Sequence, residues 1–341
     1  MRTNSLSFDD VLLIPQYSDI ESRSEVSLGS SLGVELDFTL PIISAPMDTV
    51  TETSMLAAMA HNGGLGILHR YMSAHKQEEL LNDAVRRCKP GTPFGVAVGT
   101  DSTAALRVEE LLNLGASVVC IDVAHAHHLL VKRTLQELRS EYGDDIHIMA
   151  GNVATLEAFN TLSDWGADSI KVGIGGGSIC STRIQTGHGM PTFQSVLDCA
   201  QSDRPTKLIA DGGIRNSGDI VKALAAGADF VMLGSLLAGT DETPGGFITA
   251  TGQHPRKIYR GMASKTAQMD WRKHVSSIEG VSHTVRCKGP VEEVLHELAV
   301  GIRSGLSYSG ARSIPELQAK AKFIMQTSAG TIESSTHIKR I

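Results

Sequence analysis

The chain has 341 residues, a net charge of −6, and shares of hydrophobic (41%) and charged (20%) residues that are typical of a globular protein. It has no basic run, which argues against nucleic acid as the main partner, because phosphate backbones require clustered Lys and Arg. No apolar run is long enough to span a membrane, and the N-terminal residues lack the apolar core of a signal peptide. Five scattered cysteines without zinc-ligand spacing indicate reduced thiols. We therefore expect a cytoplasmic protein that binds neither nucleic acid nor membrane.

Short runs rich in Val and Ile alternate along the chain with amphipathic stretches such as Ser102–Leu114, Val131–Glu141, Thr155–Trp165 and Asp219–Ala226. Near-continuous apolar strands alternating with helices indicate a parallel sheet, and eight such units predict a single-domain (β/α)8 TIM barrel over residues 1–341. An open doubly wound sheet is the alternative. The eight predicted strands are Pro41–Met47, Leu65–His69, Gly95–Gly99, Val118–Ala124, Ile146–Val153, Ser169–Ile174, Lys207–Gly213 and Phe230–Ala238.

Polar and glycine-rich clusters follow the predicted strands, where a barrel gathers its active residues. They are Asp48, His69-Arg70, Asp122, Asn152, Gly175–Cys180, Asp211–Gly213 and Gly234-Ser235. Beyond the barrel, Tyr259–Gly280 is polar and is interpreted as a mobile flap. Val291–Gly305 is interpreted as the last barrel helix. The tail, 324–341, is expected to be frayed or to serve as an arm for a neighbouring subunit.

Cys180 lies in a loop that contains three consecutive glycines and several hydroxyl side chains, not in an apolar repeat. Glycines let a backbone approach a ligand closely, and a cysteine on such a loop can reach a substrate as a nucleophile. The glycine pairs at the ends of the seventh and eighth strands, together with Ser178 and Ser235, predict a phosphate site, because barrels place phosphate there.

Five segments resemble motifs of the IMP dehydrogenase / GMP reductase family, in the family's order and over almost the whole chain. They are Ser44–Val50, Lys171–Arg183, Ala210–Ile214, Met232–Ser235 and Tyr259–Ser264. The resemblance implies that Cys180 attacks C2 of the purine of a bound GMP or IMP. Thr182 and Glu279 would handle the leaving amine and protons, with Asp122 and Arg70 in support. Arg70 stands where reductases carry a lysine, and arginine cannot release its proton.

The same resemblance implies the ligand contacts. Asp211 would bind the ribose, whereas Asp122, Ala124 and His125 would lie by the cofactor. Carbonyls of Gly175, Gly177 and Cys180 match a potassium site, to which a neighbouring subunit would add Glu333, Ser334 and Ser335 in a homotetramer. The remaining substrate contacts would be Met47, Asn152, Ser178, Gly213, Gly234, Ser235, Tyr259, Gly261, Met262 and Ala263.

The flap favours one branch of the family. A dehydrogenase must activate water, which the family does with an Arg-Tyr pair on a long flap, whereas a reductase expels ammonia. Here only 14 residues separate Ser264 from Glu279, and they contain no tyrosine. The stretch from Arg70 to Gly95 is also too short for the pair of regulatory CBS modules of typical dehydrogenases. We therefore expect NADPH-dependent reduction of GMP to IMP and ammonia.

Two alternatives remain open from the sequence. Ser44–Glu52 and the Glu333-Ser-Ser segment look more like the dehydrogenase branch, which would use NAD and water to convert IMP to XMP. A catalytically silent purine-nucleotide sensor would keep the binding loops. An intact Cys180, Thr182 and Glu279 argues against the sensor, because sensing needs no nucleophile.

Overall fold

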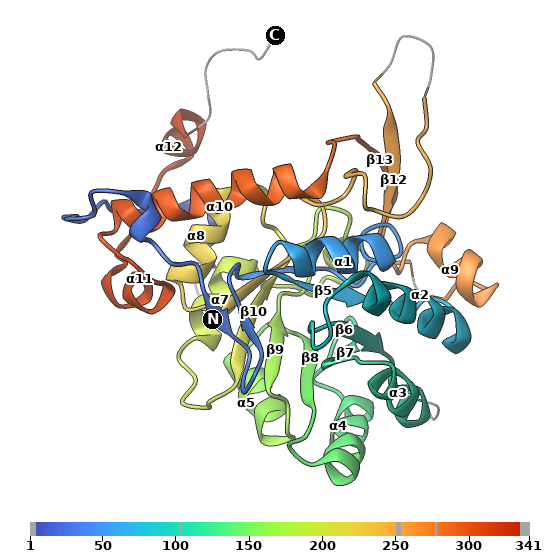
Figure 1. Ribbon diagram of the computed structural model, residues 1–341. Coiled ribbons are helices and arrows are strands. Elements are labelled where there is room, and N and C mark those ends of the chain that lie inside the picture. The colour runs from blue at the N-terminus through green and yellow to red at the C-terminus, as the bar shows by residue number, and fades with distance from the viewer. Residues whose placement is uncertain (1–4, 102–103, 250–253, 277, 335–341) are drawn as a thin grey trace.

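The computed structural model describes residues 5–101, 104–249, 254–276 and 278–334. Eight parallel strands close into a barrel in the order β10-β11-β4-β5-β6-β7-β8-β9 (Figure 1). All eight coincide with the predicted apolar runs, so the predicted (β/α)8 barrel is confirmed. The barrel strands are β4 (Ile42–Ser44), β5 (Leu65–Leu68), β6 (Gly95–Val98), β7 (Val118–Asp122), β8 (His147–Val153), β9 (Ser169–Val172), β10 (Lys207–Asp211) and β11 (Phe230–Leu233).

Helices connect the strands and surround the barrel. Several begin at a side chain that caps the free backbone N–H groups of the first turn: Thr155 accepts from Ala158, and Asn216 accepts from Asp219. The helices are α1 (Thr53–His61), α2 (Ala74–Arg87), α3 (Ala104–Asn113), α4 (Leu129–Tyr142), α5 (Leu156–Asp164), α6 (Thr182–Thr186), α7 (Thr192–Cys199), α8 (Ser217–Ala225), α9 (Lys265–Arg272), α10 (Val291–Tyr308), α11 (Ile314–Lys320) and α12 (Ser328–Glu333).

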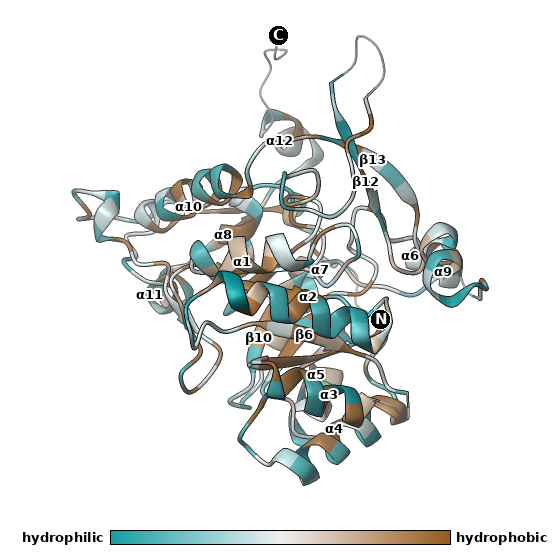
Figure 2. Cartoon of the chain, turned by 45° about the vertical axis from the view of Figure 1, so that its right-hand side comes forward, coloured by the Kyte–Doolittle hydropathy of each residue, from teal (hydrophilic) through white to brown (hydrophobic). Residues whose placement is uncertain are grey.

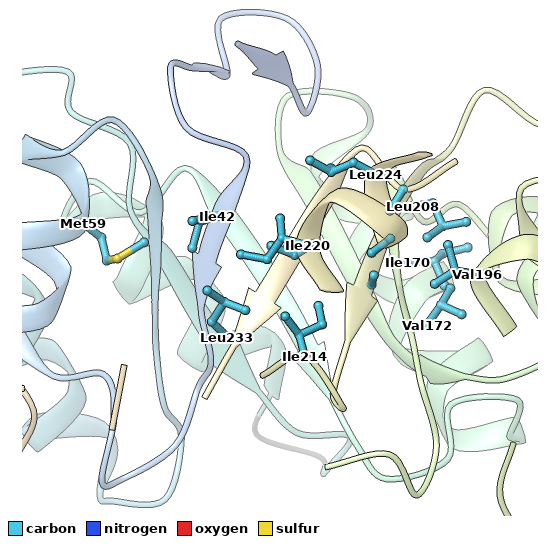
Figure 3. Packing of buried hydrophobic residues seen from close by; sticks show 14 of the residues in the cluster. Ile42, Met59, Ile170, Val172, Val196, Leu208, Ile214, Ile220, Leu224 and Leu233 are labelled. Carbon is cyan, nitrogen blue, oxygen red and sulfur yellow. The ribbon is translucent and has the colours of Figure 1, made fainter. Parts of the chain in front are cut away.

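Two apolar layers result from the alternation of side chains along each strand. In β4, Ile42 packs outward among helix residues, whereas Ile43 points into the barrel interior. Strand β11 repeats this pattern, with Phe230 and Met232 inside and Leu233 outside. Figure 3 shows the outer layer, in which the strand side chains meet those of the surrounding helices. Figure 2 shows the corresponding hydropathy, with hydrophilic residues along the outward side of α2.

The amino end of the barrel is closed by a small hairpin. Strands β2 (Ser30–Ser31) and β3 (Asp37–Phe38) pair antiparallel, and the Phe38 ring packs edge-on against Phe230 with centroids 5.7 Å apart. Because Phe230 begins β11, this contact lies at the amino end of the barrel strands. The hairpin leaves the carboxyl end uncovered, and this is the end at which the sequence analysis predicts the active residues.

An antiparallel ribbon of β12 (Arg256–Arg260) and β13 (Ser282–Arg286) projects from the carboxyl end, and α9, which connects the two strands in the sequence, lies beside the base of the ribbon (Figure 1). Helix α9 therefore forms the middle of the predicted flap, a regular element that the sequence analysis does not anticipate. Among the described residues, no helix is long and apolar enough to span a membrane.

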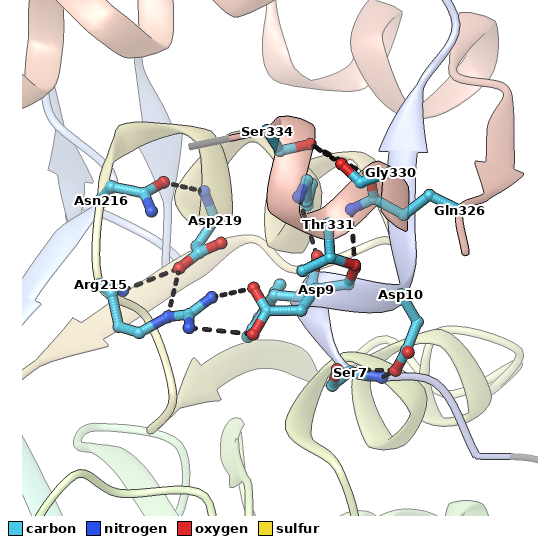
Figure 4. Close-up of polar contacts among 12 residues, drawn as sticks. Ser7, Asp9, Asp10, Arg215, Asn216, Asp219, Gln326, Gly330, Thr331 and Ser334 are labelled. Atoms are coloured by element: carbon cyan, nitrogen blue, oxygen red, sulfur yellow. Dashed lines mark hydrogen bonds and ion pairs between the residues drawn. The ribbon is translucent and has the colours of Figure 1, made fainter. Parts of the chain in front are cut away.

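The described part of the tail differs from the expectation of a frayed end or free arm. Strand β14 (Phe323–Met325) pairs antiparallel with β1 (Val11–Leu13), which satisfies backbone groups of both segments. Two 3-10 turns, η1 (Phe8–Asp10) and η2 (Arg23–Glu25), flank this region. Gln326 and Thr331 both donate to the Asp9 carbonyl, at 2.7 and 3.1 Å (Figure 4). The tail is therefore docked on its own chain up to residue 334.

Candidate active site

A cavity of about 800 Å³ opens at the carboxyl end of the barrel, within the usual size of ligand pockets. The structure brings together at this cavity every residue that the sequence analysis assigns to substrate and catalysis, and some of those assigned to cofactor and cation. These are Met47, Arg70, Asp122, Ala124, Asn152, Gly175, Gly177, Ser178, Cys180, Thr182, Asp211, Gly213, Gly234, Ser235, Tyr259, Gly261, Met262, Ala263 and Glu279.

The loop between β9 and α6 presents Cys180. Its backbone N–H donates to the Gly177 carbonyl at 3.1 Å, which folds the loop into a turn. The half-buried thiol donates to the Thr182 hydroxyl, with Sγ and Oγ1 3.2 Å apart. A hydroxyl so close accepts a hydrogen bond from the thiol and can donate one to the thiolate, the form in which a cysteine acts as a nucleophile.

Backbone hydrogen bonds join the flap to this loop. The Ser181 N–H donates to the Glu279 carbonyl at 2.9 Å, and the Val281 N–H donates to the Ile179 carbonyl at 3.0 Å. Glu279 in turn donates its own N–H to the Ala263 carbonyl at 3.2 Å. These contacts place Glu279 beside the Cys180 loop, although Glu279 and Cys180 are almost a hundred positions apart in the sequence.

Gly213, Gly234 and Tyr259, which the sequence analysis assigns to the phosphate, line the same cavity as Cys180. Gly213 has a φ of +80° and so adopts a conformation that favours glycine. A Cβ at Gly234 would come within 2.8 Å of the Tyr259 hydroxyl. Burial raises the pKa of Tyr259 to about 12, against a lowering by its hydrogen bond with Ser178. Tyr259 therefore stays protonated near neutral pH and can donate a hydrogen bond to an anion.

Charged side chains gather at the base of the cavity. Lys171, which is 1% exposed, forms an ion pair with Asp122 and lies 3.9 Å from the Asp211 carboxylate. The Asn152 amide donates to Asp211 and to the Gly173 carbonyl, both at 2.8 Å. Burial raises the pKa of Asp211, partly opposed by Lys171 and Asn152. The Asn152 and Lys171 contacts hold the Asp211 carboxylate at the base of the cavity.

An aromatic wall closes one side of the cavity. Arg70 donates from Nε to the Asp122 carbonyl at 3.2 Å, and its guanidinium lies 4.8 Å from the centre of the Tyr71 ring. The Tyr71 ring packs edge-on against Trp271 of α9, with centroids 5.3 Å apart. This wall joins the loop after β5 to the flap.

A comparison with known proteins assigns the chain to a family. Residues 5–337 match the model of the IMP dehydrogenase / GMP reductase domain. The chain belongs to this family. It is 37% identical to inosine-5′-monophosphate dehydrogenase of Cryptosporidium parvum, covering 97% of this chain and 94% of that protein. It is 34% identical to the dehydrogenase of Nitrosopumilus maritimus, over 97% and 98% of the two chains.

GMP reductases are also among the similar proteins. The GMP reductase of Leishmania major is 31% identical, over 97% of this chain and 96% of that protein. The crystal structure of a GMP reductase from Trypanosoma brucei in complex with guanosine 5′-monophosphate superposes with a TM-score of 0.93. It shares 30% identity and covers 99% of each chain. The family is therefore an oxidoreductase family of purine nucleotide metabolism, with both reactions represented among the relatives.

Some residues assigned by the family resemblance do not lie at the cavity. His125 is exposed and is not among its lining residues, although Ala124 beside it is. Glu333 and Ser334 end α12, which packs near η1, and Ser334 donates to Gln326 at 3.1 Å. Ser335 lies outside the described residues. The roles of these four residues in the family's cofactor and cation sites stay predictions.

The sequence analysis assigns no role to Lys171 and does not single out Tyr71. A signal for Lys171 was present, because a lysine inside an otherwise apolar barrel strand is rarely buried unless it is paired. No comparable signal marks Tyr71, whose place depends on how the flap packs. Among the described residues, no group of three or more His, Cys, Asp and Glu side chains could hold a metal ion. This finding does not bear on the predicted potassium site, whose ligands would be backbone carbonyls and not these side chains.

Proposed function

We propose that this protein is a GMP reductase that converts GMP to IMP and ammonia with NADPH. The observation that carries the proposal is the short flap, which has one arginine and no tyrosine between Ser264 and Glu279. That arginine, Arg272, lies over the Trp271 ring at 4.4 Å and donates to Ser276 at 3.2 Å. The flap itself therefore offers no Arg-Tyr pair to activate water, and a reductase needs none.

The proposed steps assign a task to each residue at the Cys180 loop. The Cys180 sulfur bonds to C2 of the purine, and the bond from C2 to its amino group breaks to release ammonia. Thr182, 3.2 Å from the sulfur, relays the thiol proton to the Glu279 carboxylate, and this pair then delivers the proton to the leaving amine. NADPH, when bound, supplies a hydride to C2. Breaking of the C–S bond then returns the Cys180 thiolate and releases IMP.

The polar residues of the cavity are proposed to bind the phosphate and ribose of the nucleotide. Tyr259 and Ser178 would donate to the phosphate together with backbone N–H groups at Gly213, Gly234 and Ser235, since glycine allows close approach there. Asp211 would accept from the ribose hydroxyls. The purine would lie beside Cys180 among Met47, Asn152, Gly261, Met262 and Ala263.

The cofactor side is proposed to lie beyond Asp122. The cavity continues past Asp122 and Ala124 to Thr100, Asp101 and Arg107, so it has room for a second ligand beside the nucleotide. NADPH would bind there, with His125 reaching it from the rim. Potassium would be held by the carbonyls of Gly175, Gly177 and Cys180. A homotetramer would let a neighbouring subunit contribute Glu333 and Ser334 to that ion.

IMP dehydrogenase is the second candidate. Most of the similar proteins carry that name, and Arg70 and Tyr71 offer an Arg-Tyr pair at the cavity from another part of the chain. Burial and the charge of Asp122, however, raise the pKa of Tyr71 above its ordinary range. A phenol held protonated is a poor base for water, which favours the reductase.

The deciding experiment follows nicotinamide absorbance in two parallel reactions of the purified protein, with potassium in both. One contains GMP and NADPH, and the other contains IMP and NAD. Loss of reduced cofactor in the first reaction alone supports the reductase. Formation of reduced cofactor in the second reaction would establish the dehydrogenase and contradict the proposal. Inactivity in both, with nucleotide still bound, would favour a sensor.

A further inference from the structure

Lys171 is a charged residue in the wall of the barrel. It is the third residue of β9, between Ile170 and Val172, and only 1% of its surface is exposed. Burying an ammonium group costs free energy unless it is paired with opposite charge. The position of Lys171 therefore depends on its partners, and these are two of the carboxylates at the base of the cavity.

The two carboxylates come from strands on either side of β9. Asp122 ends β7 and forms an ion pair with the Lys171 ammonium. Asp211 ends β10, and its carboxylate oxygen lies 3.9 Å from the same nitrogen. Lys171 is therefore shared between them, with Asp122 as the closer partner, while Asn152 holds Asp211 from its other side at 2.8 Å.

The protonation states of Lys171, Asp122 and Asp211 depend on one another. Burial opposes the charged form of Lys171, but Asp122 and its neighbours outweigh burial and raise the pKa of the lysine, which stays protonated. The pKa of Asp211 is raised by burial and by the nearby charge of Asp122, and Lys171 is the first influence that opposes this. Two carboxylates this close, without the cation between them, would favour protonation of one of them.

We propose that Lys171 is a positioning residue that acts through both carboxylates: it holds Asp122 on the cofactor side and keeps Asp211 ionised on the ribose side. Nucleotide affinity then depends on Lys171, because Lys171 keeps the Asp211 carboxylate in the form that accepts hydrogen bonds from the ribose hydroxyls. The inference rests on the proposed function, because that function assigns the ribose to Asp211 and the cofactor to Asp122.

Other titratable groups near this cluster must be considered in any pH-dependent test. These groups interact electrostatically with Lys171, with Asp122 and Asp211, or with the two nearby tyrosines. They are Cys120, Arg70, Tyr71, Tyr259 and Arg272. The pKa of each of the two tyrosines and of Cys120 is raised by burial. Titration of these three groups therefore lies on the alkaline side, and a change of GMP binding on the acid side reports the carboxyl groups of the cluster.

The test compares Lys171→Met with the wild-type protein by calorimetric titration of GMP between about pH 5 and 9. The variant keeps most of the length of the side chain and loses its charge. We expect its Kd for GMP at neutral pH to rise by about tenfold or more, since an unpaired buried carboxylate accepts a proton. Because Asp211 loses an interaction that lowers its pKa, binding should also fail at a higher pH than in the wild type. Lys171→Arg should restore part of the affinity.

Lys207→Met is a matched control on the neighbouring strand. Lys207 begins β10 at the opposite end of the barrel and pairs with Asp229 at 3.0 Å, with a half-buried side chain. Its loss should leave GMP affinity and the pH profile unchanged. If Lys171→Met fails to fold, the variant Lys171→Met with Asp122→Asn removes both charges of the closer pair and still leaves Asp211 without its cation.

The outcomes separate the inference from the proposed function. Wild-type protein that binds neither GMP nor IMP would overturn the proposed function and the inference with it. Wild-type protein that binds GMP, with a Lys171→Met profile identical to it, would overturn the inference alone. A uniform loss of affinity at every pH, without restoration by arginine, would show a role in folding only and would also overturn it.

Discussion

The guanidinium of Arg260 donates to the carboxylate of Asp48 from two nitrogens, with Nη2–Oδ2 and Nε–Oδ2 distances of 2.6 and 3.0 Å. Both side chains are mostly buried, at 16% and 14% exposure. Asp48 follows the first barrel strand, whereas Arg260 ends β12 at the start of the flap. A third nitrogen of the same guanidinium donates to Asp270 of α9 at 2.5 Å. Arg260 therefore ties the flap to the barrel.

Asp48→Asn should loosen this attachment. Removing one charge from a largely buried pair costs about 2 kcal/mol, and the flap that carries Glu279 should open more often. We expect faster amide hydrogen exchange in α9 and a fall in kcat/KM of about tenfold. Asp203→Asn is the control, because Asp203 is 81% exposed in its pair with Arg204 and surface pairs contribute little. Equal exchange in both variants would contradict the role of Arg260.

Cys180→Ala should abolish turnover without abolishing nucleotide binding. The variant lacks the sulfur that bonds to C2, so we expect the rate to fall by about a thousandfold or more. Calorimetry should still detect GMP, because the proposed phosphate and ribose contacts remain. Mass spectrometry of the stopped wild-type reaction should reveal a protein–nucleotide adduct that the variant lacks. Cys88→Ala, at a half-buried thiol outside the cavity, should behave as wild type. Turnover by Cys180→Ala at close to the wild-type rate would contradict the covalent step.

Gly176→Ala should disturb the nucleophile loop through Thr192. A Cβ at position 176 would lie 2.3 Å from the Thr192 hydroxyl, which is buried without a hydrogen-bond partner among the described residues. Overpacking of this kind costs about 1–3 kcal/mol, and a displaced loop should lower kcat/KM by about tenfold to a hundredfold.

Thr192→Ala tests that contact directly. In the double variant the hydroxyl is gone, and the next atom, the Thr192 Cβ, lies 3.6 Å from the added Cβ, an ordinary contact. We expect Thr192→Ala to restore activity to Gly176→Ala, and Thr192→Ser, which keeps the hydroxyl, to restore none. Steady-state kinetics of the wild type, Gly176→Ala, Thr192→Ala and the double variant form a double-mutant cycle. Additive effects would show that the loop is disturbed by something other than this contact.

His147 should make the fold sensitive to acid. It is 8% exposed in β8, and its Nε2 lies 2.8 Å from the Ser169 hydroxyl. Burial lowers its pKa from 6.5 to about 4, with Asp168 opposing and Arg139 assisting the shift. Between pH 6.5 and about pH 4, His147 is therefore protonated in the unfolded chain and neutral in the folded chain. Stability contributed by neutral His147 is present above pH 6.5 and is lost as the pH falls towards 4, by about 3 kcal/mol.

His147→Gln removes the titrating group and keeps a polar atom facing Ser169. We expect its free energy of unfolding to depend less on pH than that of the wild type in this window, as measured by urea denaturation at several pH values. His75→Gln serves as the control, because the His75 side chain is 81% exposed. A wild-type profile in His147→Gln would show that other groups dominate the acid sensitivity.

The barrel could be predicted from the sequence because its signals are local. Each strand is a short apolar run that is buried on both faces, so a few consecutive residues suffice to mark it. The candidate nucleophile could also be picked out from the sequence, since Cys180 stands among glycines and hydroxyls where no packing pattern accounts for it. The ends of predicted strands also pointed to Asp122, Asn152 and Asp211, because parallel strands in a barrel share one carboxyl end.

The structures of the tail and the flap could not be predicted from the sequence, because they depend on contacts with residues that are distant in the chain. Strand β14 forms by pairing with β1, more than 300 residues away, and its short sequence carries little periodicity. Helix α9 is held by Arg260 and by the contact between Tyr71 and Trp271. Such contacts leave no repeat in the sequence, so a polar segment with glycine and serine is easily taken for an irregular loop.

The sequence by itself determined the barrel, the nucleophile loop and the family resemblance, because these depend on local periodicity and on contiguous motifs. Tertiary structure decided which charges meet. Lys171 is paired with Asp122 at a separation of 49 residues, and Thr192 limits what Gly176 can become. These relationships arise only when the barrel closes and brings the ends of separate strands within hydrogen-bond distance.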